Sequence, residues 1–337
     1  MSRRQVDLSS PRGVIGVLLG VSLALFSRVA SAQAFLPPAG EGDVATTYQA
    51  AFTRGQLNNG GARISPDSTD AHSLTWDAEF GLSDRLAVNF SLPFITAKFA
   101  GGPSPHLVGI HGQPSNLDNG TYHGSFQDFQ FGARFNVVRS RTFALTPFAE
   151  VSIPSHHYES LGQAVVGRDL RALIVGAAVG GFVDAILTGL YVQTELSHAV
   201  VQQVLGIRAS PSRVNSEVGY YVTPRFAVRF LENFQITDDG IDFVGPYPPT
   251  FAIHSGGSIT RDYRLNHDRL LRSNFLNLGA GVSFAVNDSL DFFASTARMA
   301  WGENVQRHRD VTVGTNWHFR LRPATSPSPQ KTYTTRR

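Results

Sequence analysis

The chain contains no cysteine among its 337 residues, so disulfide bonds and thiolate metal ligands are excluded. A lipid-bearing cysteine behind a leader segment is excluded for the same reason. Only 16% of the residues are charged and the formal net charge is +3. No basic stretch is interleaved with aromatic residues, and we therefore expect no nucleic-acid partner.

Long apolar runs are also scarce, and the one that stands out covers residues 13–26. It follows a basic segment with three arginines and precedes the small residues Ala30 and Ala32. This order predicts a secretory signal peptide over residues 1–32, because the run is too short to span a bilayer. A retained membrane anchor is the alternative. No later apolar run has the length of a membrane helix, so a membrane-embedded mature chain must cross as strands.

What the sequence does contain is alternation, seen clearly in "GLSDRLAVNFSLPFI" at residues 81–95. Leu86, Val88 and Phe90 alternate with the smaller or polar Ala87 and Asn89. Successive side chains of a strand point to opposite faces, so this segment predicts a strand with one apolar and one polar face. The apolar face would turn inward in a soluble sandwich and outward to lipid in a membrane barrel.

The same pattern, bounded by turn residues, recurs along the whole chain. Each candidate is long enough to cross a bilayer at a tilt, for which roughly 9 to 11 residues suffice. The candidate strands are residues 43–53, 72–82, 85–99, 125–138, 141–153, 169–183, 189–199, 212–222, 225–236, 272–286, 289–299 and 310–319. The sixth is apolar almost throughout, so a buried helix is its competing interpretation.

The connections between these strands alternate in length. Short links follow the second, fourth, sixth, eighth and tenth strands, and long links follow the odd-numbered ones, the largest being residues 100–124 and 237–271. Short periplasmic turns, long extracellular loops and an even strand number are typical of outer-membrane barrels, whereas a Greek-key sandwich does not sort its loops this way. We predict an all-β, antiparallel transmembrane β-barrel of about 12 strands in the bacterial outer membrane.

The predicted barrel covers residues 43–319, after a short N-terminal segment at 33–42. Trp317 and Phe319 end the last strand, where we expect contact with outer-membrane lipid at the periplasmic interface and with the barrel-assembly machinery. Residues 320–337 are basic and rich in proline, serine and threonine, and they lack an apolar period. This composition predicts a disordered C-terminal tail.

The polar faces of the strands carry charged residues that would point into the barrel. Two interpretations remain open for them, a path for a small-molecule solute and structural ion pairs. Counting from the short turns places the arginines in the periplasmic half, and Asp128, Glu150 and Glu195 toward the external half. The full predicted lumen set is Asp77, Glu79, Arg85, Asp128, Arg134, Glu150, Glu195, Glu217, Arg225, Arg229 and Asp291.

Candidate chemistry is sparse. "HSGGS" at residues 254–258 places histidine beside serine, but it is no strand-turn-helix nucleophile elbow. His156, His157 and residues 237–242 have metal-binding side chains without the spacing of a complete zinc or calcium site. We therefore expect no catalytic residues, no metal ligands and no cofactor, and we predict that the chain is not an enzyme.

The chain resembles the family named for the MetA-pathway of phenol degradation. The resemblance runs through "EFGLSDRLAVNFSLPF", "GSFQDFQFGARFNVV" and "LTPFAEVSIPS", at residues 79–94, 124–138 and 145–155, and through the closing strand. It implies an outer-membrane channel or transporter for a small solute of the hydrophobic or aromatic class, and it supplies no catalytic residues. A structural or surface-interaction barrel and an outer-membrane hydrolase are the alternatives.

We predict that the signal peptide is cleaved after Ala32, because Ala30 and Ala32 lie just beyond the apolar run. N-terminal sequencing of the protein purified from outer membranes should begin at Gln33. A mature chain that begins before Ser27 would show that the apolar run is retained.

Overall fold

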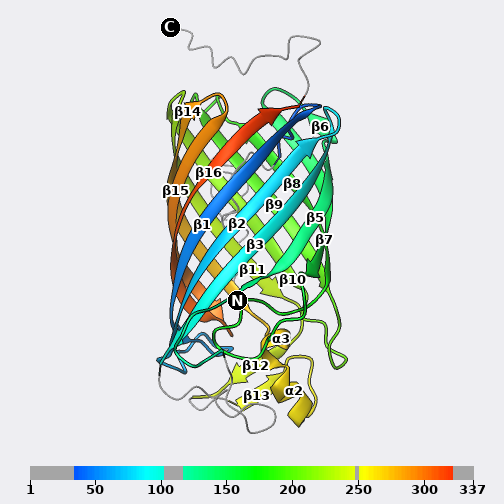
Figure 1. Ribbon diagram of the computed structural model, residues 1–337, viewed down its shortest axis with the longest axis vertical. Coiled ribbons are helices and arrows are strands. Elements are labelled where there is room, and N and C mark those ends of the chain that lie inside the picture. Colours follow the sequence, from blue (N-terminus) through cyan, green and yellow to red (C-terminus); the bar gives the residue numbers. More distant parts are fainter. Residues whose placement is uncertain (1–33, 102–116, 247–249, 322–337) are drawn as a thin grey trace, which may run out of the picture.

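The computed structural model of the chain describes residues 34–101, 117–246 and 250–321. The predicted signal peptide and most of the predicted C-terminal tail lie outside these residues. Twelve strands of the described chain form one closed antiparallel barrel (Figure 1). The fold class is therefore as predicted. No helix in these residues is long and apolar enough to cross a membrane.

The barrel strands follow one another around the wall in chain order, and the fourth is divided into three short pieces. Their bounds are β1 (Glu41–Gln56), β2 (Ser68–Gly81), β3 (Leu86–Ala100), β4 (His123–Phe126) with β5 (Asp128–Phe135) and β6 (Val138–Arg139), β7 (Phe143–Pro154), β8 (Ala172–Phe182), β9 (Leu190–Val201), β10 (Pro211–Thr223), β11 (Phe226–Thr237), β14 (Asn274–Asn287), β15 (Leu290–Glu303) and β16 (Gln306–Arg320). The sixth candidate strand is thus β8, a strand and not a buried helix.

The break between β4 and β5 lies opposite Pro93 of β3. β3 pairs Phe94 with Phe126 but Ser91 with Gln130, so the register shifts by one residue between these pairs. Proline has no N–H to give to the ladder, and such residues are tolerated at bulges. The bulge explains why one predicted strand is observed as separate pieces.

The two faces of the strands are those predicted from the alternation. Val88 and Phe90 are 38% and 42% exposed on the outside of the barrel, whereas Ala87 and Ser91 are buried on its inside. The same division holds on β16, where Val311, Val313 and Trp317 are exposed and the intervening residues are not. The outer surface is an apolar band suited to lipid.

One predicted connection is wrong. The link after the eleventh strand was expected to be long, but β15 ends at Glu303 and β16 begins at Gln306, which leaves a two-residue turn, Asn304 and Val305. Asn304 has a positive φ of 51°. The extra strand residues include Arg307 and Arg309 on the outside of β16, and these charges interrupt the apolar alternation by which the start of that strand was located.

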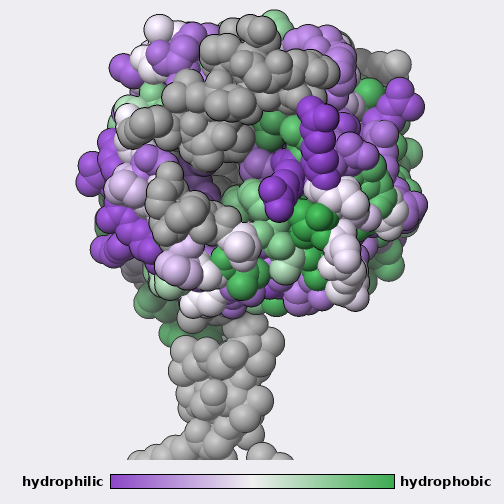
Figure 2. Space-filling view, turned by 90° about the horizontal axis from the view of Figure 1, so that it is seen from below, coloured by the Kyte–Doolittle hydropathy of each residue, from purple (hydrophilic) through white to green (hydrophobic). Residues whose placement is uncertain are grey.

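The long connections gather at one end of the barrel and carry the remaining elements (Figure 1). Residues 238–246 and 250–273 form a lid with β12 (Ile241–Val244), β13 (Thr250–Ile253), α2 (Arg261–Leu265) and α3 (His267–Leu270). Residues 155–171 form a second segment at this end, named the strap below. Figure 2 looks onto this external face, where hydrophilic residues occupy much of the edge and hydrophobic residues gather nearer the centre.

We predict that removing the tail after Leu321 leaves assembly intact, whereas deleting Trp317, His318 and Phe319 abolishes it. β16 pairs with β1 from His308 to Arg320, and this seam closes the barrel. Shortening it would leave backbone groups of both strands without partners in lipid. Heat-modifiable gel mobility measures the folded fraction, and equal loss in both deletions would contradict this account of the closing strand.

Candidate functional site

Arg134 lies at the centre of the charged residues inside the barrel. Its side chain is 6% exposed, and its guanidinium nitrogens lie 3.3 Å from Glu195 on β9 and 3.8 Å from Glu79 on β2. Glu195 also accepts a hydrogen bond of 3.3 Å from Asn215 on β10. One side chain from β5 thus connects strands on either side of it, and the lumen is narrow at this level.

An aromatic ring supports this arginine. The guanidinium carbon of Arg134 lies 5.2 Å from the centre of the Phe148 ring, a cation-π arrangement. Phe148 in turn lies over Gly176 of β8, where an added Cβ would come within 2.6 Å of the ring. Glycine here makes room for the aromatic side chain, which holds the arginine in the lumen.

A second cluster of the same composition forms around Arg229 of β11. Its guanidinium group lies 3.4 Å from Glu217 on β10 and 5.8 Å from the centre of the Phe293 ring. The Tyr191 hydroxyl donates a hydrogen bond to the other carboxylate oxygen of Glu217. A Cβ at Gly314 would lie 2.2 Å from the Phe293 ring, so glycine again accommodates the aromatic residue.

Most other predicted lumen residues also lie inside the barrel. Glu150 accepts a hydrogen bond of 2.9 Å from Asn89, and Asp77 lies half-buried on the lumen face of β2. Asp128 accepts a hydrogen bond from Tyr158 toward the external end. Asp291 lies near the periplasmic end, beside a histidine described below.

Two of the predicted lumen residues are misplaced. Arg85 and Arg225 lie in the exposed periplasmic turns before β3 and β11, not on the lumen wall. The first turn has four residues and not two, and the second is displaced by one residue along the chain, so both arginines lie outside the strands.

The predicted vertical separation of charges is also wrong. Glu195 was expected above Arg134, but the two are in contact. Counting residues from each short turn ignores the tilt of the strands, which changes the height of equivalent positions around the wall. The opposite charges therefore meet as pairs and do not form separate zones.

His318 was not predicted and joins three strands at the periplasmic end. Its Nδ1 contacts Asp43 of β1, and its Nε2 lies 2.9 Å from Asp291 of β15. A carboxylate is an acceptor, so two such contacts favour an imidazolium that donates from both nitrogens. The cluster spans the seam at which the barrel closes. The alternation along the last strand could have placed His318 on the lumen face, since it shares that face with Asn316.

Residues 34–40 cross the periplasmic mouth. The Ala34 carbonyl accepts hydrogen bonds from Asn136 Nδ2 at 3.0 Å and from Thr146 Oγ1 at 2.6 Å, and Ala34 is completely buried. The Phe35 ring lies 6.5 Å from that of Phe182. The segment thus lies inside the barrel before it enters β1, and no periodic signal in the sequence indicates this.

The strap crosses the opposite, external mouth. Tyr158 within it is buried and bonds to Asp128, and this burial and hydrogen bond raise the pKa of Tyr158. Farther along, the Gln163 carbonyl accepts a hydrogen bond of 3.2 Å from Thr69 of β2, and its side chain accepts one of 2.6 Å from Gln306 of β16. The strap, which connects β7 to β8, is therefore fixed to β2 and β16, the two strands that flank β1.

Positive charge accumulates where the strap meets the lid. Arg168 donates to the carbonyl oxygens of Arg269 at 2.9 Å and Ala209 at 3.1 Å. Burial, together with the nearby cations Arg213 and Arg269, lowers the pKa of Arg168 to about 10. Arg168 still carries its charge at neutral pH, so the external entrance is basic on this side.

An apolar cluster lies next to these charges, formed by the inner faces of β7, β8 and β9 and by the end of the strap. It consists of the buried residues Phe148, Leu170, Ile174, Ala199 and Val201. Phe148 belongs both to this cluster and to the Arg134 site. The external half of the lumen therefore offers an apolar surface beside a charged one.

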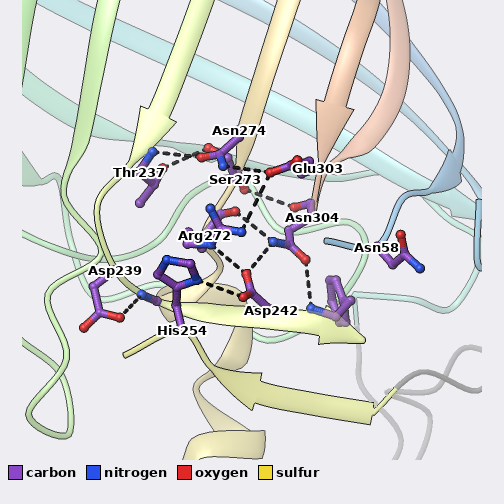
Figure 3. A network of polar contacts seen from close by, with 12 residues as sticks. Asn58, Thr237, Asp239, Asp242, His254, Arg272, Ser273, Asn274, Glu303 and Asn304 are labelled. Carbon is purple, nitrogen blue, oxygen red and sulfur yellow. Dashed lines mark hydrogen bonds and ion pairs between the residues drawn. The ribbon is translucent and has the colours of Figure 1, made fainter. Parts of the chain in front are cut away.

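The lid is tied to the rim by the polar network of Figure 3. The Asp242 carboxylate accepts hydrogen bonds from Arg272 Nε at 2.7 Å and Asn304 Nδ2 at 2.6 Å, and lies 3.2 Å from His254 Nδ1. The Asn304 side chain also accepts from the Phe243 N–H at 2.8 Å. Asn304 is the turn residue between β15 and β16, so this turn holds the lid in place.

The residues considered for catalysis are distributed among different contacts. His254 has an acidic partner, but Ser255 bonds to Asp239. His156 lies 3.1 Å from Ser125 and 2.8 Å from Ser155, whereas the histidine beside an aspartate is His157, 2.6 Å from Asp169. In the described residues no group of three or more potential ligands is arranged to hold a metal ion.

Comparison with solved structures supports the architecture. The chain is similar to the crystal structure of the COG4313 outer membrane channel from Pseudomonas putida F1, with a TM-score of 0.62 and 13% identity over 87% of this chain and 100% of that one. The chain has the fold of an outer-membrane β-barrel. Its likeness to the translocator domain of the autotransporter NalP from Neisseria meningitidis has a TM-score of 0.48, at 11% identity over 91% of this chain and 97% of that one. The likeness to the NanC porin structure has a TM-score of 0.44, at 9% identity over 82% of this chain and 98% of that one.

No protein-family model matches the chain, and no curated protein matches it. The resemblance to the phenol-degradation family therefore stays a prediction. At 13% identity, the likeness to the Pseudomonas channel shows the fold alone.

We predict that replacing Arg134 and Arg229 together by alanine makes the pore more conductive and about threefold more cation-selective. The change removes bulk from the narrow level and leaves Glu195 and Glu217 without their cations. Single-channel recording in planar bilayers measures both effects. The E195Q/E217Q variant should shift selectivity in the opposite direction, and R225A at a periplasmic turn should change neither. Unchanged selectivity in the arginine double variant would contradict the assignment.

Proposed function

We propose that the barrel is an outer-membrane channel that passes a small solute through a narrow, charge-lined lumen. The observation that carries the proposal is Arg134, which contacts acids on β2 and β9 from its position on β5. A lumen narrow enough for one arginine to connect these strands suits small molecules and disfavours bulky hydrophilic ones.

The solute class that we infer is hydrophobic or aromatic. The buried cluster around Phe148 and Ile174 provides an apolar surface within the external half of the lumen. Aromatic rings at Phe148 and Phe293 lie beside cationic groups, an arrangement that also suits a planar ring. The resemblance to the phenol-degradation family implies the same class of compound.

Two further elements of the proposal concern assembly. We infer that the mature chain begins at Gln33, directly before the buried Ala34, and that the residues after Leu321 form a tail in the periplasm. Trp317 is exposed at the periplasmic end of β16, and we propose that it engages the barrel-assembly machinery together with Phe319.

We expect low single-channel conductance for simple ions, and faster swelling of liposomes in small aromatic solutes than in disaccharides. Protein-free liposomes and liposomes with heat-denatured protein correct for direct permeation of the bilayer. Conductance like that of a wide general porin would contradict the narrow lumen. Swelling equal to that of protein-free liposomes for every solute would favour a structural or surface-interaction barrel.

A further inference from the structure

Two arginines lie directly opposite each other on the lipid-facing surface of the barrel. Arg298 of β15 is paired in register with Arg309 of β16, and both side chains are exposed. Arg309 shares its outward face with Val311 and Val313, which are 49% and 44% exposed. Arg307, the next outward residue on β16, is exposed as well.

Such a pair is unfavourable unless something lies between the charges, because like charges directly opposite on a sheet repel. Within residues 34–101, 117–246 and 250–321, no carboxylate comes within 4.0 Å of these three guanidinium groups. Asp70, on an outward position of β2, is paired with Arg54 at 2.7 Å. Leu278 of β14 lies between Arg298 and Glu232 of β11, because it is paired in register with both residues.

The height of the pair is fixed by its position along β16. From Trp317 near the periplasmic end, the strand rises about 20 Å to Arg309 and about 25 Å to Arg307, at the usual rise per residue and a tilt of about 40°. The lipid-facing band of such barrels is about 25 Å tall. The arginines therefore lie at the outer edge of the apolar band, where headgroups of the outer leaflet begin.

The surroundings on this face suit a lipid. Below the arginines the outward positions of β16 are Val311 and Val313, which would contact acyl chains. The Arg309 guanidinium lies 5.8 Å from the centre of the Phe52 ring of β1, which directs its charge along the surface. Planar guanidinium groups bind phosphate with two parallel hydrogen bonds, so two of them facing one gap form a strong phosphate site.

We propose that Arg298 and Arg309, with Arg307 above them, bind the phosphate of a phosphorylated glycolipid in the outer leaflet. The phosphate neutralises the facing cations, and its acyl chains cover the valines beneath. The site lies on the outside of the wall and is independent of the lumen and of the solute proposed for it.

The test compares binding of bis-phosphorylated lipid A, enzymatically dephosphorylated lipid A and inorganic phosphate to the full chain in detergent, by microscale thermophoresis. We expect dephosphorylation to weaken binding about tenfold or more, and R298Q/R309Q to lose the same factor for the phosphorylated lipid only. R298K/R309K should retain part of the affinity, because it keeps the charges without the planar fork.

The matched control is R225Q, which removes an exposed arginine at a periplasmic turn. It should bind phosphorylated lipid A like the unmodified chain. Equal binding by R298Q/R309Q, or equal binding of dephosphorylated lipid A, would overturn the proposal. Competition by inorganic phosphate at equal concentration would overturn the assignment to a lipid.

Heat-modifiable mobility establishes that each variant is folded before its affinity is measured. If R298Q/R309Q does not fold, the single variants R298Q and R309Q replace it. Each should bind phosphorylated lipid A more weakly than R225Q does, and unchanged affinity in both would count against the site.

Discussion

Contact with lipid on one face of every strand is the constraint on which the rest of the structure depends. A bilayer core offers no hydrogen-bond partners, so the backbone groups of the wall must pair with one another. The seam between β1 and β16 completes this pairing, and it is reinforced at the periplasmic end by His318 between Asp43 and Asp291. An apolar outer face then leaves the inner face for the polar residues that lie at the level of the hydrocarbon.

The narrow lumen determines what those inward residues do. A buried charge needs a partner, and partners lie close together when the opposite wall is within reach of one side chain. Arg134 and Arg229 each pair with a glutamate and each lie on a phenylalanine ring, whose space comes from a glycine on a neighbouring strand. The lumen wall and the packed interior are therefore built from the same residues, which makes the lumen narrow and lines it with paired charges.

The strands and their faces could be predicted because lipid imposes a period of two, as at Val88 and Phe90. The same parity placed Glu150, Glu195, Glu217 and Arg229 in the lumen. Contacts across the lumen could not be predicted, since Arg134 and Glu195 are far apart in the chain and strand tilt obscures their relative height. Ala34 and Tyr158 escaped prediction for another reason, because segments that cross a barrel mouth follow no period.

The misjudged turn between β15 and β16 shows what the alternation measures. The apolar residues of the alternation indicate contact with the hydrocarbon core of the bilayer. The alternation therefore ends where the hydrocarbon ends, even though the pairing of the strands continues beyond that level. Arg309 is a strand residue paired with Arg298, yet the alternation placed it in the loop before the last strand. Where a strand continues beyond its apolar alternation, it has reached the level of the outer headgroups. Charged residues on its outward face at that level need partners from the headgroup region. The lumen arginines Arg134 and Arg229 meet this requirement by pairing with glutamates, whereas the partner proposed for the outer arginines is a lipid phosphate.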